Sequence, residues 1–161
     1  MRSSMFGWSL LCLGGLCCTL QAEEPKDPLA TLQGEWQATQ FVDNGYEIPK
    51  PVVDHLRVTI KGDKLSYVLP DVDDPAKPSP LKIEIAIAVH ADQPQAMDAK
   101  LTQGPFKEKL RYGIYDLEKD TLRICLPLLP TAKRVTTFES VKGSGLCQLT
   151  LRRINPATLP K

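Results

Sequence analysis

Apolar and polar residues alternate with a period of two along almost the whole chain from residue 34 onward. Such alternation is typical of β-strands with one face toward a core. In the first run the shared face carries Trp36, Ala38, Gln40 and Val42. Further runs cover residues 56–60, 65–69, 82–90, 97–102, 110–114, 121–126 and 146–153, with a short segment at 135–139. No stretch has the length and 3.6-residue period of a substantial helix.

The spacing of these runs predicts how the strands are connected. Turn sequences such as Asp43-Asn44-Gly45 and Lys61-Gly62-Asp63-Lys64 separate them, and no helical crossover lies between them. The pattern therefore predicts an all-β, eight- to nine-stranded antiparallel meander, preceded by one helical turn at residues 29–33. A sandwich and an up-and-down barrel both satisfy it, and barrel closure removes the exposed strand edges.

Residues 1–22 have the three parts of a secretory signal peptide. Arg2 supplies the positive start, residues 5–19 the apolar run, and Leu20-Gln21-Ala22 a small residue before the cut. The apolar run is about 15 residues, shorter than the roughly 20 that span a bilayer. Small residues directly before a cysteine, as in a lipoprotein signal, are absent from the sequence around Cys17. We expect cleavage, with periplasmic or extracellular export and no remaining transmembrane segment.

The expected organisation is one domain. A charged, proline-bearing linker at 23–28 leads into a barrel domain at 29–154, followed by a tail at 155–161. The sequence has 20 basic and 19 acidic residues, and the leader holds one basic residue and no acidic ones, so the mature chain carries no net charge. This balance argues against nucleic acid as a partner and against an electrostatic role at a membrane surface. We expect a monomer.

Two of the five cysteines, Cys125 and Cys147, lie outside the leader. Strand alternation places Cys125 opposite the apolar face of its run, whereas Cys147 shares its face with Leu149 and Leu151. Side chains on opposite faces of a sheet do not reach the separation that a disulfide needs, unless a bulge shifts one of them. Two free thiols are therefore favoured over a disulfide.

Several short motifs occur in a fixed order along the domain. The first is a glycine two residues before a tryptophan, Gly34-Glu35-Trp36, at the start of the domain. The others lie at residues 60–65, 113–117, 120–125, 137–138, 143–145 and 149–153. Together they resemble a lipocalin-like exported domain family that is abundant in planctomycete-type bacteria. The resemblance spans residues 29–153 and implies a lipocalin-like barrel and export. It implies no activity and no catalytic residues.

The resemblance also implies how one end of the barrel is closed. In lipocalin-like barrels the first-strand tryptophan plugs one end, and a basic residue late in the last strand lies across its ring. Trp36 and either Arg152 or Arg153 fit these roles, with a cation–π contact of about 0.5–2 kcal/mol. Alternation favours Arg153, and Gly34 leaves room where the chain enters the barrel.

Little in the sequence points to catalysis or to a metal. His55 and His90 lie in different runs and have no metal-ligand spacing. Asp71-Val72-Asp73-Asp74 lacks the glycine and the terminal glutamate of a calcium loop. Gly143-Ser144-Gly145 reads as a turn, and neither cysteine has a local activating motif. We expect no enzyme activity, no cofactor and no metal.

Two functions remain. In the first, the lumen binds a small apolar or amphipathic ligand, because barrels of about eight strands either fill with side chains or hold one small molecule. The lumen candidates are Ala38, Gln40, Tyr67, Ile85, Tyr112 and Ile114; packing of the same residues into a solid core is the alternative interpretation. In the second, a solid barrel binds or inhibits an envelope protein through the loops at 70–80 and 126–134.

Overall fold

The computed structural model describes residues 27–154 except 70, 72–73, 75–76, 78–81, 91–92 and 94. The expected signal peptide, most of the linker, the tail at 155–161 and most of the loop at 70–80 lie outside the described residues. So do Val72 and Asp73 of the acidic motif at 71–74.

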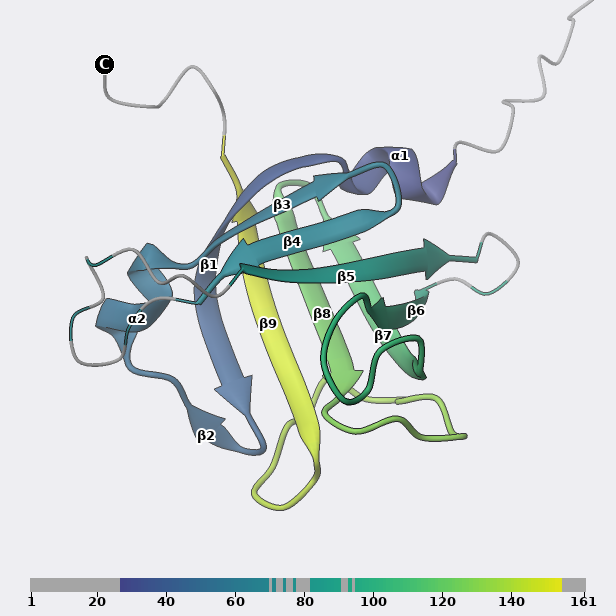
Figure 1. Ribbon diagram of the computed structural model, residues 1–161. Coiled ribbons are helices and arrows are strands. Elements are labelled where there is room, and N and C mark those ends of the chain that lie inside the picture. Colours follow the sequence, from purple (N-terminus) through teal and green to yellow (C-terminus); the bar gives the residue numbers. More distant parts are fainter. Residues whose placement is uncertain are drawn as a thin grey trace, which may run out of the picture.

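Nine strands and two short helices make up the described chain (Figure 1). The helices are α1 (Pro28–Leu32) and α2 (Lys50–His55). The strands are β1 (Gly34–Asp43), β2 (Tyr46–Glu47), β3 (Arg57–Lys61), β4 (Lys64–Val68), β5 (Lys82–Val89), β6 (Ala96–Leu101), β7 (Leu110–Glu118), β8 (Thr121–Pro127) and β9 (Leu146–Arg153).

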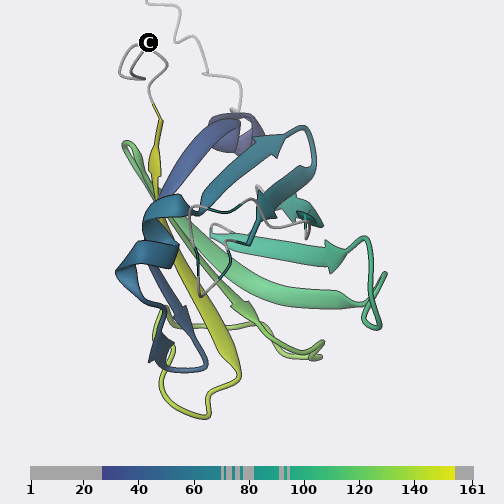
Figure 2. The same ribbon diagram turned by 60° about the vertical axis from the view of Figure 1, so that its left-hand side comes forward.

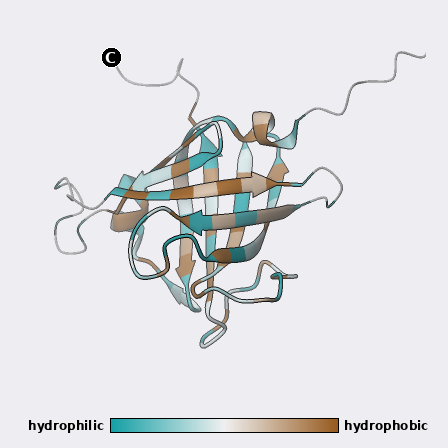
Figure 3. Cartoon of the chain, turned by 45° about the vertical axis from the view of Figure 1, so that its right-hand side comes forward, coloured by the Kyte–Doolittle hydropathy of each residue, from teal (hydrophilic) through white to brown (hydrophobic). Residues whose placement is uncertain are grey.

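The strands form a closed barrel. All pairings between them are antiparallel, in the order β2-β1-β3-β4-β5-β6-β7-β8-β9. The pairing of β1 with β9 closes eight strands on themselves, and β2 is an additional short strand on β1. This confirms the predicted all-β antiparallel barrel with a short N-terminal helical turn. Hydropathy alternates along its strands (Figure 3).

Helix α1 lies at one end of the barrel (Figures 1 and 2). This end is filled with apolar side chains. The Asp27 carboxylate accepts a hydrogen bond from the Leu29 amide at 3.0 Å, and Pro28 takes the first helical position, so the sequence favours a helix start here. The Trp36 indole donates to the Leu32 carbonyl at 3.0 Å. Fully buried around it are Leu32, Val58, Ile60, Leu122 and Leu151.

A β-bulge in β1 changes which residues face inward toward the other end. Ala38 pairs with Leu151, but Gln40 pairs with Thr150, so Thr39 is an extra residue in β1. The prediction that Gln40 and Val42 share the inner face with Ala38 is wrong. Gln40 is exposed on the outside, and Phe41 and Asp43 take the inward positions opposite Leu149 and Cys147.

A second correction concerns β7. Its register pairs Tyr115 with Ile124 and Leu117 with Leu122, and these partners belong to the core. Tyr112 and Ile114, predicted to line the lumen, therefore face outward. They are apolar because another part of the chain covers them, which strand alternation alone does not show.

That cover is the segment at 128–145, which follows β8 and contains no strand, contrary to the short run expected at 135–139. The Val135 amide donates to the Tyr112 carbonyl at 3.0 Å. The Arg134 guanidinium lies 5.4 Å from the Tyr112 ring centroid and donates to the Gly113 carbonyl at 2.8 Å. The segment thus packs on the outer face of β7 and β8.

Candidate functional site

The six residues predicted to line the lumen divide into two groups. Ala38 and Ile85 are buried on the inner face, and Tyr67 joins them there because it pairs with the fully buried Val58. Gln40, Tyr112 and Ile114 lie on the outer face. Of the six predicted residues, only Ala38, Ile85 and Tyr67 therefore line the interior.

The interior is filled at the Trp36 end and reached by solvent at the other end. Inward-facing side chains of the second half are only partly buried, although strand alternation points them into the barrel. They come from six strands and are mostly apolar: Phe41, Tyr67, Ile83, Leu101, Leu126 and Leu149. A side chain that faces inward yet remains partly exposed borders space that water reaches.

Four polar side chains lie among these apolar ones. Asp43 and Cys147 are directly paired residues of β1 and β9. Arg111 is on the inner face of β7, opposite Ala99, and Tyr67 reaches in from β4. Asp43 Oδ1 and Arg111 Nε are buried, and neither has a hydrogen-bond partner among the described residues. No ion pair joins Asp43 to Arg111 within 4.0 Å in the described structure.

The electrostatics of this cluster follow from its burial. Burial raises the pKa of Tyr67 to about 12, and electrostatic interactions with Cys147 and Asp43 act in the same direction while Arg111 opposes them. Burial, together with Asp43, likewise raises the pKa of Cys147 to about 12. At neutral pH the phenol and the thiol are therefore uncharged, which leaves Arg111 and Asp43 as the basic and the acidic side chain of the cluster.

Strand alternation assigns Arg111 to the outer face, because Arg111 stands between apolar Leu110 and Tyr112 and the apolar residues are the expected inner set. The sequence Asp43-Asn44-Gly45 predicts a turn, and only the bulge at Thr39 brings Asp43 inward. Cys147, by contrast, faces inward as the alternation predicted.

At the closed end, Arg153 and not Arg152 lies over Trp36. Its guanidinium carbon is 4.1 Å from the ring centroid. The same guanidinium donates to the carbonyls of Gln33, at 2.6 Å, and Thr31, at 2.7 Å. Gly34 has φ +126°, and a Cβ there would lie 3.2 Å from Arg153 Nη1. These residues join α1 to the last strand and leave no room for a ligand among themselves.

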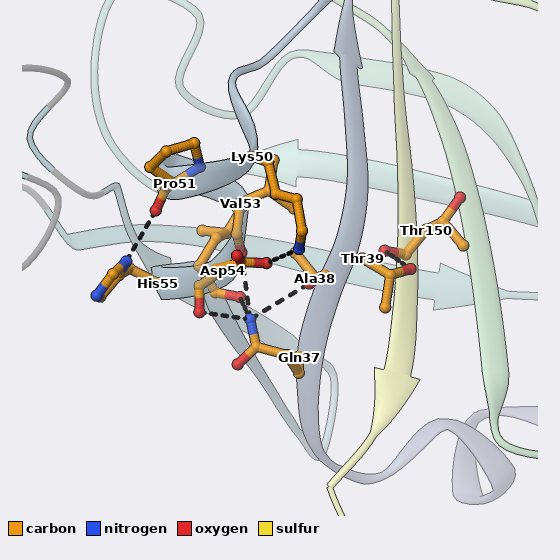
Figure 4. Close-up of polar contacts among 10 residues, drawn as sticks. Gln37, Ala38, Thr39, Lys50, Pro51, Val53, Asp54, His55 and Thr150 are labelled. Carbon is orange, nitrogen blue, oxygen red and sulfur yellow. Dashed lines mark hydrogen bonds and ion pairs between the residues drawn. The ribbon is translucent and has the colours of Figure 1, made fainter.

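A polar surface groove of about 660 Å³ lies outside the barrel, beside α2. The Gln37 amide nitrogen is within hydrogen-bond distance of four carbonyls, including those of Val53 and Asp54, and so fixes the end of α2 (Figure 4). Lys50 pairs with Asp54 at 2.6 Å. The floor of the groove is the bulged part of β1, where the Thr39 hydroxyl donates to the Thr150 carbonyl at 3.2 Å.

The two histidines lie in different parts of the fold and make different contacts. His55 ends α2, is exposed, and lies 2.8 Å from the Pro51 carbonyl (Figure 4). His90 Nε2 lies 2.9 Å from Asp98, whose other oxygen accepts a hydrogen bond from Arg134 at 2.7 Å. Among the described residues, no three His, Cys, Asp or Glu side chains gather as metal ligands would.

The cysteines lie on opposite faces of adjacent strands and are free. Cys147 faces the interior, whereas Cys125 is fully buried on the outer face of β8. Burial raises the pKa of Cys125 to about 11. Both thiols are thus protonated at neutral pH, which does not suit a nucleophile.

Comparisons with protein-family models, with curated proteins and with solved structures gave no match. In the part of the chain that the structure describes, no helix is long and apolar enough to cross a membrane.

Proposed function

We propose that this barrel binds a small amphipathic molecule in the half of its interior that lies away from Trp36. The observation that carries the proposal is the combination of partly exposed, inward-facing apolar side chains with buried polar atoms that lack partners among the described residues. An apolar body would cover Phe41, Ile83 and Leu149, and a polar group would reach Arg111 or Asp43.

The energetics favour an occupant of this kind. Covering apolar surface gains about 25 cal/mol per Å², and a buried polar atom without a partner costs about 1–3 kcal/mol. A ligand that does both lowers the free energy of the barrel interior on two counts. Polar groups placed among apolar walls are also the usual composition of small-molecule sites.

Titration with the neutral fluorophore N-phenyl-1-naphthylamine tests the proposal, with native mass spectrometry of the protein purified from its own cells as a second readout. We expect saturable fluorescence enhancement that Leu149→Trp abolishes, because it fills the interior. Thr150→Trp is the matched control, since it introduces the same side chain on the outer face of β9. Leu101→Trp fills the interior from β6 should the first variant fail to fold. Equal binding by all three variants would refute an interior site.

We also propose that the protein is exported and acts by binding rather than catalysis. Export rests on the sequence of residues 1–22, where Arg2 precedes an apolar run and Ala22 precedes the cut. N-terminal sequencing of the cellular protein should give Glu23 as the first residue. A chain that still begins at Met1 would contradict export by this route.

The alternative function is protein binding through the loops at the open end. It is favoured by three exposed apolar side chains, Tyr46 (56% exposed), Leu129 (59%) and Val141 (61%), on segments that adjoin one another. Photo-cross-linking in cells from position 129, with position 119 at the closed end as control, tests it. A specific adduct from 129 alone would support a protein partner, whereas equal labelling from both positions would not.

A further inference from the structure

We propose that the ligand carries a positively charged and a negatively charged group side by side on an apolar body, with the anion on Arg111 and the cation on Asp43. This inference rests on the proposed ligand-binding function and adds the chemistry of the polar group. It is carried by two opposite charges inside the barrel that are not paired with each other.

Both charges are incompletely satisfied. Asp43 Oδ1 and Arg111 Nε are buried without a hydrogen-bond partner among the described residues, and no described side chain pairs with either group as an ion pair. The ion pairs of the described structure lie elsewhere, for example Arg123–Asp116 and Arg134–Asp98. A buried polar atom without a partner is costly, and this cost is recovered by a group that pairs with it.

The cluster spans the interior instead of lining one wall. Asp43 and Cys147 lie on the paired strands β1 and β9. Arg111 lies on β7, two strands from β9 on one side. Tyr67 lies on β4, three strands from β9 on the other side. Tyr67 nevertheless interacts electrostatically with Cys147, Arg111 and Asp43. Cys147 likewise interacts electrostatically with both Asp43 and Arg111. A polar group bound beside the phenol and the thiol therefore lies near both side chains.

This arrangement distinguishes among polar groups. A carboxylate alone pairs with Arg111 but is repelled by Asp43, and an ammonium alone pairs with Asp43 but is repelled by Arg111. An ammonium and an anion a few bonds apart in one molecule pair with both. An apolar α-amino acid and a lipid with a phosphoethanolamine headgroup share this chemistry, and they differ in the size of the anion and of the apolar body.

Four ligands with one ten-carbon chain test the inference by isothermal titration calorimetry at pH 7.5: 2-aminodecanoate, decanoate, decylamine and 1-decanol. We expect 2-aminodecanoate to bind at least about tenfold more tightly than the other three. Decylphosphoethanolamine, titrated in parallel, distinguishes the lipid headgroup from the amino acid. Binding of that compound in preference to 2-aminodecanoate assigns the phosphate form of the same chemistry.

Matched variants should change which of the four ligands binds most tightly. Asp43→Asn removes the negative charge and should make decanoate the tightest of the simple ligands, whereas Arg111→Gln should do the same for decylamine. Double substitution should leave 1-decanol as good as any charged ligand. Arg57→Gln, which removes an exposed arginine from the outer groove, should leave every affinity unchanged.

The outcomes separate the two proposals. If none of the ligands and no N-phenyl-1-naphthylamine binds, ligand binding itself is wrong. If the fluorophore binds and decanoate matches 2-aminodecanoate, or if Asp43→Asn leaves the ranking unchanged, the interior binds amphiphiles but the paired-charge inference is overturned.

Discussion

Arg153 contacts four groups at the closed end of the barrel. It lies over the Trp36 ring and donates to two carbonyls around α1, at Gln33 and Thr31. Its Nε also lies 3.8 Å from the Asp120 carboxylate. Arg152, one residue earlier, points to the outer surface and is exposed. Two neighbouring arginines of identical chemistry therefore differ in effect only because a strand turns successive side chains to opposite faces.

Arg153→Met should destabilise the fold by about 2–4 kcal/mol, because a cation–π contact and two charge-assisted hydrogen bonds are lost. Urea unfolding followed by Trp36 fluorescence and circular dichroism measures the change. Arg152→Met is the control and should stay within about 0.5 kcal/mol of the parent. Equal losses for the two variants would show that charge, not position, matters here.

Gly45 offers a second test at the residue scale. It has φ +80°, and a Cβ there would lie 2.0 Å from the Lys142 amide nitrogen, so the turn after β1 packs tightly on the segment at 140–146. Gly62 has φ +60°, but a Cβ there meets no described atom within 4 Å. Both glycines take a conformation that costs an alanine about 1–2 kcal/mol, and only Gly45 adds a backbone clash.

We therefore expect Gly45→Ala to lower the free energy of unfolding by at least about 2 kcal/mol more than Gly62→Ala does. Chemical unfolding of the two variants side by side isolates the clash, since the conformational cost is common to both. Equal destabilisation would mean that the segment at 140–146 moves away at little cost.

At the scale of the elements, the eight strands of the barrel, their direction and their order follow from the sequence, because alternation and turn residues are local signals. The short strand β2 does not follow from it, and the run expected at 135–139 is not a strand. The inner and outer faces follow only in part. Ala38, Tyr67 and Ile85 are placed correctly, whereas Gln40 is displaced by one extra residue at Thr39. Tyr112 and Ile114 are apolar because the segment at 128–145 covers them. A bulge and a distant cover are tertiary features that leave no period in the sequence.

The interior polar cluster is not predicted from the sequence either, because it too depends on tertiary features. An arginine between two apolar residues of a strand is normally assigned to the solvent face, and the register of β7 and β8 is needed to assign Arg111 to the inside. The sequence pattern does not predict helix α2 either. Its six residues are too few for a helical period, and Gln37 fixes its C-terminal carbonyls from a neighbouring strand.

The covering segment at 128–145 leads to a prediction for Cys125. Arg134 holds this segment through Asp98 and the Gly113 carbonyl, and the fully buried Cys125 is on the outer face of β8, against which the segment packs. Arg134→Gln should increase the rate at which iodoacetamide labels Cys125 by about tenfold, because local opening becomes easier. Peptide mapping by mass spectrometry gives the rate at this one site.

Lys133→Gln provides the control for that measurement, since its exposed side chain changes charge in the same segment without a described ion pair. It should leave the labelling of Cys125 unchanged. Labelling that increases equally in both variants would assign the effect to net charge and not to the contacts of Arg134.

The whole molecule should lose stability at alkaline pH. An unfolded thiol ionises near its ordinary pKa of 9.0, whereas burial keeps Cys125 protonated to about pH 11 and Cys147 to about pH 12. Above pH 9 the unfolded chain therefore binds fewer protons than the folded one, and stability falls as the pH rises. Below pH 9 these thiols contribute no pH dependence.

Each thiol should cost about 2 kcal/mol by pH 10.5, at about 1.4 kcal/mol per pH unit. Urea unfolding at pH 7.5 and 10.5 in reducing buffer measures the loss, and Cys125→Ala should remove its share of the difference between the two pH values. The readout is this difference, because lost packing lowers stability equally at both. An unchanged difference would contradict a buried, protonated Cys125.

The pairing of β1 with β9 has a consequence for how the chain is made. Thr39 and Thr150 touch although 111 residues separate them, and the Ile154 amide donates to the Glu35 carbonyl at 2.8 Å. During synthesis the first strand is therefore left with an open edge until the final residues emerge. Contacts between such distant segments form slowly. Loss of the last eight residues of the barrel should prevent folding altogether, where trimming the end of a helical bundle would merely fray it.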